Sequence, residues 1–258
     1  MKSILSRVHV AVLTGLHRLT SGKKEMESKR ARLDRFISVN TGINRKHVRL
    51  MLAKGRVRVD GELARDIDQV VDEFSHICLD DKVLQANEAS YVMLHKPVGV
   101  VSATIDDKHR TVIDLLEQDD KESLHIVGRL DLNTSGLLLL TNDGRWSKRL
   151  MDPEHKVGKL YRVHLQNPLT PDYISGFAQG MYFEFEDITT LPAELEIIDS
   201  YTALVTLYEG RYHQIKRMFG RFRNPVIGLH RISVGNIVLD NNLKPGESRV
   251  LTPKEIAL

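Results

Sequence analysis

The sequence predicts an α+β protein in which a small N-terminal module of two helices and a hairpin precedes a larger body with a mixed, largely antiparallel sheet. Apolar residues recur at helical spacing near the N-terminus. From Tyr91 onward, short apolar segments alternate with turn residues, without the regular strand and helix rhythm of a parallel α/β fold. A chain of 258 residues is long enough for both parts.

The composition is that of an ordinary globular protein, with 41% hydrophobic and 28% charged residues. The single cysteine, Cys78, excludes an intramolecular disulfide and is typical of a reducing compartment, so we expect a cytoplasmic protein. No run approaches the roughly 20 apolar residues that cross a bilayer, and we expect no membrane partner. No two histidines are three or four residues apart and there is no C-x-x-C, so no metal site is predicted.

The sequence predicts three parts. Residues 1–30 precede the first patterned helix and form an N-terminal extension in which we expect little order. Residues 31–88 form the small module and a linker, because the acidic, mixed stretch up to residue 88 separates two different patterns. Residues 89–258 form the larger domain.

The small module begins with apolar residues on one face of residues 33–37, and the pattern repeats at residues 48–52. Two short helices are therefore predicted. Gly42 suits the end of the first helix, and Asn44 suits the start of the second. Alternating residues around an Asp-Gly pair at positions 60–61 then predict a hairpin.

Positive charge is concentrated in this module. The segment from Lys29 to Arg65 contains eleven Lys or Arg and three acids, a net charge of +8, whereas the whole chain carries +3. A solvated charged surface is the alternative, but few acids interleave, and the pattern is typical of a polyanion-binding surface. We expect nucleic-acid binding through exposed basic residues of the second helix and the hairpin, namely Arg45, Lys46, Arg49, Lys54, Arg56 and Arg58.

In the larger domain, strands are predicted at YVMLH, HIVGRL, LLLLT, LYRVHL, ALVTLY and NIVLD. The stretch GRLDLNTSGLLLLTNDG, residues 128–144, places Asp131 in a connection that emerges from the core. Burial disfavours a charged carboxylate, so an ionised Asp131 needs a nearby cation or hydrogen-bond donors. A calcium loop of the EF-hand type fails because Asn142 occupies the position of the bidentate Glu. A structural Asx turn at Asp131 remains an alternative.

Two further stretches carry candidate chemistry. EGRYHQIKRMF, residues 209–219, predicts an amphipathic basic helix after a strand, which could aim Lys216 at an acid at a neighbouring strand end. In VGKLYRVHL, Tyr161 shares a strand face with Lys159 and Val163, as a core aromatic or as a ring that stacks on a base. The chain has no P-loop, G-x-G-x-x-G or G-x-S-x-G motif, so nucleotide hydrolysis, dinucleotide redox chemistry and acyl transfer have no support.

Together these stretches resemble the pseudouridine synthases, in particular the branch that modifies single sites in ribosomal RNA. Residues 128–144 resemble the central motif of the family, with Asp131 at the catalytic aspartate. HKPVGVVSAT resembles the early K-P-x-G strand and turn, KLYRV the tyrosine motif and EGRYHQIKRMF the basic motif. Residues 32–61 resemble the small RNA-binding module shared with a small-subunit ribosomal protein and tyrosyl-tRNA synthetases. The resemblance spans residues 31–256.

The resemblance implies a pseudouridine-synthase-type catalytic domain that isomerises uridine without a cofactor or a metal. The target base is flipped out of its stack. Asp131 acts as nucleophile or as base toward the ribose, Lys216 pairs with Asp131, and Tyr161 stacks on the flipped uracil and helps to remove the C5 proton. Arg129 supports the loop or contacts RNA, and we also expect Arg217 to contact RNA.

The form Y-H-Q-I-K-R-M, with lysine at position 216, resembles enzymes that act on 16S ribosomal RNA, whereas large-subunit relatives tend to carry arginine there. We therefore expect a single uridine of 16S rRNA as the substrate, either in free RNA or in an assembling small ribosomal subunit. The alternatives are the same reaction on 23S rRNA or tRNA, and a non-catalytic rRNA-binding assembly factor. We expect a monomer.

Overall fold

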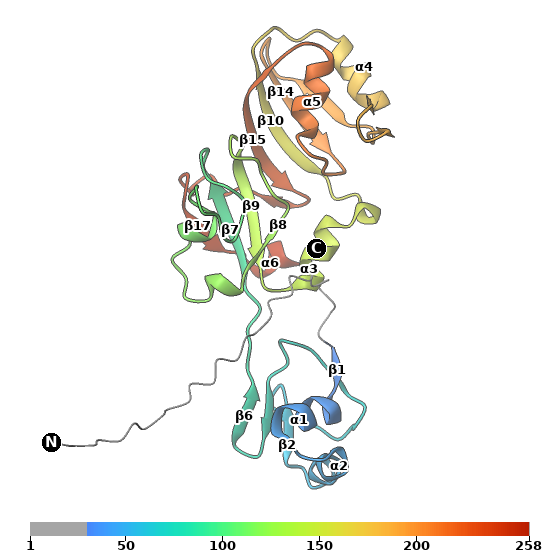
Figure 1. Ribbon diagram of the computed structural model, residues 1–258, viewed down its shortest axis with the longest axis vertical. Coiled ribbons are helices and arrows are strands. Elements are labelled where there is room, and N and C mark those ends of the chain that lie inside the picture. The colour runs from blue at the N-terminus through green and yellow to red at the C-terminus, as the bar shows by residue number, and fades with distance from the viewer. Residues whose placement is uncertain (1–29, 258) are drawn as a thin grey trace, which may run out of the picture.

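The computed structural model describes residues 30–257, so the extension expected over residues 1–30 lies outside the described residues except for Arg30. The elements of the N-terminal part are β1 (Ala31–Arg32), α1 (Leu33–Thr41), α2 (Arg45–Ala53), β2 (Val57–Val59), β3 (Glu62–Leu63), β4 (Val70–Val71), β5 (Ile77–Leu79) and β6 (Lys82–Gln85). They lie together at one end of the molecule (Figure 1).

Local sequence explains the two helices and the hairpin. Gly42 ends α1 in the left-handed conformation, φ 74°, and its N–H donates to the carbonyl of Ser38 at 3.0 Å. The side chain of Asn44 caps α2 by accepting a hydrogen bond from the N–H of Lys46 at 2.9 Å. Residues 60 and 61 both have positive φ, as a tight two-residue turn between β2 and β3 requires. These elements lie where the sequence predicts them.

This part has its own hydrophobic core. The sheet order is β3, β2, β5, β6, with all pairs antiparallel, and β1 pairs with β4. One face of each helix packs on the strands. The buried residues are Leu33, Ile37, Val48, Leu52, Val57, Val59, Ala64, Val71, Ile77 and Leu79.

The larger part is built on a sheet that has nine strands within residues 30–257. Its main order is β13 (Glu194–Ile197), β14 (Thr202–Leu207), β10 (Lys159–Leu165), β15 (Val226–Val234), β9 (Ser135–Thr141), β7 (Tyr91–Lys96) and β17 (Ser248–Val250); β8 (His125–Val127) pairs with β9, and β16 (Ile237–Val238) with β15. Among the strand pairs described for this sheet, only β15 and β9 run parallel. The predicted mixed, largely antiparallel sheet is confirmed.

Helices and a short hairpin complete this part. They are α3 (Gly144–Met151), α4 (Asp172–Gln179), α5 (Gln214–Arg221), α6 (Pro253–Ile256) and the hairpin of β11 (Tyr182–Phe183) and β12 (Ile188–Thr189). Single 3₁₀ turns lie at Ile113–Leu115, Lys121–Ser123 and Pro153–His155. Helices α4 and α5 lie beside β10 and β14 at the end of the molecule opposite to α1 and α2 (Figure 1). No helix within residues 30–257 is long and apolar enough to cross a membrane.

Strand β9 explains the run of four leucines. Leu138 and Leu140 point into the core that contains α4 and α5, whereas Leu137 and Leu139 point into a second core with Trp146 of α3. A strand buried on both faces needs apolar residues at consecutive positions instead of an alternating pattern. The strand thus anchors the loop that precedes it on two sides.

The far end of β9 contacts the N-terminal part. Asn142 follows the strand, accepts a hydrogen bond from the N–H of Ser90 at 2.8 Å and donates to the carbonyl of Glu88 at 2.9 Å. Arg145, at the start of α3, forms a 2.8 Å salt bridge with Asp72. The strand that carries the Asp131 loop at one end is therefore tied at its other end to the residues around the linker.

The longest strand, β15, is not among the predicted strands. Its sequence, VIGLHRISV, contains Gly228, His230 and Arg231, which interrupt the apolar pattern expected of a strand. It meets the start of β9 at Gly136, which lies directly opposite Arg231. At this point the two halves of the sheet join. One half contains β13, β14, β10 and β15, and the other contains β9, β7 and β17.

Candidate active site

A pocket of about 750 Å³ opens where the two halves of the sheet meet. The loop between β8 and β9 contributes Asp131, and β10 contributes Tyr161. The segment leading into α5 contributes Tyr212 and His213, and the first turn of α5 contributes Lys216. These segments are far apart in sequence. The pocket therefore forms only when the sheet and α5 are assembled.

Asp131 and Lys216 form an ion pair. The Nζ atom of Lys216 lies 3.2 Å from Oδ2 of Asp131, and both side chains are about one-third exposed. The core-facing residues of α5, including Ile215, Met218 and Phe219, bury one side of the helix and so turn Lys216 toward the loop. The sequence prediction that a distant helix brings a lysine to Asp131 agrees with this geometry.

A second basic group lies on the other carboxylate oxygen. The Nε2 atom of His213 is 3.4 Å from Oδ1 of Asp131. His213 precedes α5 with φ 49° and ψ 32°, a left-handed backbone that is uncommon for a residue other than glycine. The carboxylate of Asp131 is therefore flanked by an amine and an imidazole from the same segment.

The Asp131 loop is closed by its backbone and not by an Asx turn. The N–H of Thr134 donates to the carbonyl of Asp131 at 3.0 Å. The polar contacts of the Asp131 carboxylate within residues 30–257 are those to Lys216 and His213. The Asx-turn alternative is therefore wrong, because the side chain points away from the loop into the pocket.

Lys96 holds the backbone of this loop from its buried side. Its fully buried amine donates to the carbonyls of Asp131 at 3.1 Å and Thr134 at 2.8 Å, and also to that of Pro97 at 2.9 Å. Burial, reinforced by Arg231 and opposed by Asp131, lowers the pKa of Lys96 to about 8. The amine thus remains mostly protonated at pH 7 and can donate three hydrogen bonds to carbonyl oxygens that face inward.

Replacing Lys96 with methionine is expected to lower the free energy of unfolding by about 2–4 kcal/mol, because several carbonyl oxygens lose their donor. Urea denaturation measures this loss. Lys159→Met is the matched control. Lys159 is also buried, and burial lowers its pKa, but within residues 30–257 its amine donates only to the carbonyl of Val157, at 3.4 Å. A loss for Lys159→Met as large as that for Lys96→Met would contradict a specific role of Lys96 in holding the loop.

Arg231 and Gly136 fix the strands around the loop. The buried guanidinium of Arg231 donates to the carbonyls of Leu137 and Gly128, each at 2.8 Å. These carbonyls lie on either side of the Asp131 loop. Gly136 has φ 109°, and a Cβ atom there would overlap the backbone of Arg231. Close approach of the two strands therefore requires glycine at position 136.

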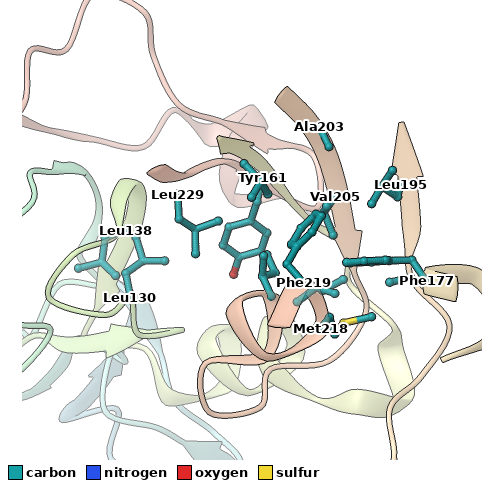
Figure 2. Packing of buried hydrophobic residues seen from close by; sticks show 14 of the residues in the cluster. Leu130, Leu138, Tyr161, Phe177, Leu195, Ala203, Val205, Met218, Phe219 and Leu229 are labelled. Atoms are coloured by element: carbon teal, nitrogen blue, oxygen red, sulfur yellow. The ribbon is translucent and has the colours of Figure 1, made fainter. Parts of the chain in front are cut away.

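Tyr161 belongs both to the core and to the pocket. Its side chain is only 8% exposed and packs in the cluster that contains Leu229, Val205 and Phe219. In Figure 2 the ring lies between Leu229 and the group around Phe219. The same residue lines the pocket that contains Asp131. The two alternatives for Tyr161, core aromatic and pocket aromatic, are thus compatible.

Arg129 and Arg217, the other expected RNA contacts in the larger part, differ in whether an acid already pairs with them. Arg129 is exposed, lines the pocket and forms no ion pair within residues 30–257. Arg217 instead forms a bidentate ion pair with Glu186 at 2.5 and 2.6 Å, and its guanidinium lies 3.7 Å from the centre of the Phe183 ring. An RNA phosphate would have to displace Glu186 from Arg217.

The six basic residues that the sequence predicts as RNA contacts of the N-terminal part are all exposed, but three of them are paired with acids. Arg45 and Arg49 lie 2.9 and 3.4 Å from the buried carboxylate of Asp34, and Arg56 lies 2.6 Å from Asp80. Burial opposes ionisation of Asp34, but hydrogen bonds from Arg45 and Arg32 outweigh it and lower the pKa of that carboxyl. Lys46, Lys54 and Arg58 form no ion pair within the described residues.

Sequence reasoning missed three residues of the site. His213 stood in the quoted basic motif without a role, Lys96 stood in the K-P-x-G motif without a role, and Arg231 lay in a strand that was not predicted. A lysine at the end of an otherwise largely apolar strand, as Lys96 is in YVMLHK, was the available signal. Within residues 30–257, no group of three or more His, Cys, Asp or Glu side chains is arranged to hold a metal ion.

The sequence and the fold match a known class of RNA-modifying enzyme. A model of the RNA pseudouridylate synthase family matches residues 90–220, which include Asp131, Tyr161 and Lys216. A crystal structure of a pseudouridylate synthase is similar with a TM-score of 0.64 and 39% sequence identity, covering 87% of this chain and 97% of the other. The chain belongs to the RNA pseudouridylate synthase family and is an isomerase.

Two similar proteins carry a more specific name than the family. The chain is 50% identical over 226 residues to the ribosomal small subunit pseudouridine synthase A of Pseudomonas aeruginosa, covering 87% of this chain and 98% of the relative. It is 42% identical over 226 residues to the protein of the same name from Vibrio cholerae, covering 88% and 98%. Both matches are longer than the match to the family model over residues 90–220.

Proposed function

We propose that this enzyme converts one uridine of 16S ribosomal RNA into pseudouridine in the cytoplasm. The observation that carries the proposal is the Asp131 carboxylate in a pocket at the junction of the sheet, paired with Lys216 at 3.2 Å. The two relatives named above as small-subunit enzymes, at 50% and 42% identity, support the choice of RNA. The enzyme acts on this RNA as a monomer, free or within an assembling small subunit.

The reaction consumes no oxidant, reductant or other second reactant. The bond between N1 of uracil and C1′ of the ribose breaks, the base turns, a bond forms between C5 and C1′, and the C5 proton is lost while N1 gains one. The product is an isomer of the substrate. Because both faces of the uracil must be reached, the base leaves its stack and enters the pocket.

The pocket residues have distinct proposed roles. Asp131 acts on the ribose, as a nucleophile at C1′ or as a base, because its carboxylate points into the pocket. Lys216 pairs with that carboxylate at 3.2 Å and so fixes its position in the pocket. Tyr161 supplies an aromatic face for the uracil from within the core, where its position is fixed by packing. Arg129 offers an uncompensated positive charge to an RNA phosphate.

We assign RNA affinity outside the pocket to residues 31–88, as a small basic module with a linker that precedes the catalytic domain of residues 89–258. Its separate hydrophobic core supports treating it as a unit. Because Asp34 and Asp80 pair with three of the six predicted basic contacts, Lys46, Lys54 and Arg58 retain the charge that a phosphate can use.

The triple variant Lys46→Gln, Lys54→Gln, Arg58→Gln is expected to weaken RNA binding and to lower the slope of log Kd against log salt by about 2. Titration of labelled 16S rRNA fragments at several salt concentrations measures both effects. The control neutralises three exposed lysines of the catalytic part, Lys108, Lys244 and Lys254. An unchanged slope in the first variant, or an equal change in both, would show that the module surface is merely solvated.

Mapping pseudouridines in total RNA tests the substrate directly. A strain without this gene is expected to lack one pseudouridine in 16S rRNA, and the wild-type gene should restore it. A site lost from 23S rRNA or tRNA would replace the proposed substrate by another RNA. Loss of no site would favour the non-catalytic assembly factor.

A further inference from the structure

Tyr212 has an unusually open position for an aromatic residue at this pocket, because its side chain is 75% exposed. Single exposed apolar side chains are common on protein surfaces and need no function. The surroundings of Tyr212 distinguish it from such residues. It lies beside the groups that contact the Asp131 carboxylate.

The ring of Tyr212 is stacked on the ring of His213. Their centroids are 3.9 Å apart and their planes differ by 20°. His213 in turn approaches Asp131, with 3.4 Å between Nε2 and Oδ1. One face of Tyr212 is therefore covered by His213, and the exposed remainder of the ring is one side chain removed from the candidate catalytic carboxylate.

The backbone around Tyr212 is held by several contacts. The buried side chain of Gln214 accepts a hydrogen bond from the N–H of Arg211 at 3.1 Å and donates to Glu209 at 2.9 Å. His213 keeps the left-handed backbone described above, a conformation that persists only where the surroundings impose it. The exposed ring is thus presented by a fixed segment, at little entropic cost to a ligand that stacks on it.

We propose that Tyr212 is a stacking platform for the nucleobase adjacent to the target uridine. This inference rests on the proposed function. When the uridine leaves its stack, the neighbouring base loses a contact, and an aromatic face at the mouth of the pocket can replace that contact. Stacking on tyrosine is tolerant of base identity because every base has a π face. The platform would hold the flanking base while the uracil enters the pocket.

The test compares Tyr212→Ala with Tyr212→Phe on a 16S rRNA fragment that the wild-type enzyme converts. The alanine variant is expected to lose roughly 5- to 100-fold in kcat/KM, whereas the phenylalanine variant, which keeps the ring, should stay within about twofold. Tyr201→Ala removes an exposed tyrosine whose side chain does not line the pocket and should match the wild type. Equal activity of Tyr212→Ala and wild type would overturn the proposal.

Abasic substrates identify the base that stacks. An RNA without the base on one side of the uridine should react more slowly with the wild-type enzyme, and Tyr212→Ala should cause no further loss on that RNA. Tyr212→Ala and the missing base could instead lower the rate independently, so that their fold losses multiply. If this holds for an abasic position on either side of the uridine, Tyr212 does not stack on a neighbouring base. If the wild type converts a 23S rRNA or tRNA fragment instead of a 16S fragment, the same variants are compared on that RNA. A different natural substrate would then disprove the proposed function but not this inference.

Discussion

Asp131→Asn is expected to lower the rate of pseudouridine formation by at least about 10³-fold, because an amide of the same shape can serve neither as a nucleophile nor as a base. Affinity for RNA should remain within about threefold of wild type, since the substitution removes a negative charge from a site that receives a polyanion. Single-turnover release of the C5 proton from tritiated RNA measures the rate, and filter binding measures the affinity.

The matched control is Asp119→Asn, which alters an exposed carboxylate in a loop outside the pocket. It should leave both quantities unchanged. More than a tenth of the wild-type rate in Asp131→Asn would remove Asp131 from the chemistry. Equal losses of RNA affinity and of rate would instead mean that Asp131 maintains the structure of the binding site.

Gly136→Ala should lower the free energy of unfolding by at least about 4 kcal/mol, a size reserved for substitutions that break the core or the backbone arrangement. The Cβ atom would lie 2.6 Å from the backbone nitrogen of Arg231 and overlap its carbonyl, so β9 and β15 could no longer approach. The backbone conformation at φ 109° adds strain for any residue with a side chain. Chemical denaturation followed by circular dichroism measures the loss.

Gly246→Ala separates the two causes. Gly246 has a similar φ of 95°, but a Cβ atom there would meet nothing within 4 Å. Only the strain term remains, so the loss should be about 1–3 kcal/mol. If both alanine variants lose the same free energy, the close contact between β9 and Arg231 is not the cause of the requirement for glycine.

The sequence allowed prediction of those elements whose signals are local. The caps at Gly42 and Asn44 and the turn at residues 60–61 depend on neighbouring residues only, and all three are found. The amphipathic pattern of α5 likewise predicted which side of that helix is buried. The pairing of Lys216 with Asp131 required more, because the two residues are 85 positions apart; the family motifs supplied that information.

Other parts of the site could not be predicted because their signals depend on tertiary packing. Strand β15 carries an arginine that is buried only because carbonyls from two other segments surround its guanidinium. No pattern within VIGLHRISV reveals those acceptors. Similarly, the basic surface of the module looked uniform in sequence, whereas Asp34 and Asp80 pair with only some of its arginines.

The contacts at the far end of β9 fix the distance between the Asp131 loop and the residues around the linker. The Asp131 loop precedes the strand, and Asn142 and Arg145, which bind the residues around the linker, follow it. Seven residues of extended chain span roughly 20 Å. An RNA held by the basic module would thus meet the pocket at a set distance, and only a uridine at the matching position along the folded RNA would reach Asp131. Under the proposed function, selection of a single site would then depend on this distance in addition to recognition of bases.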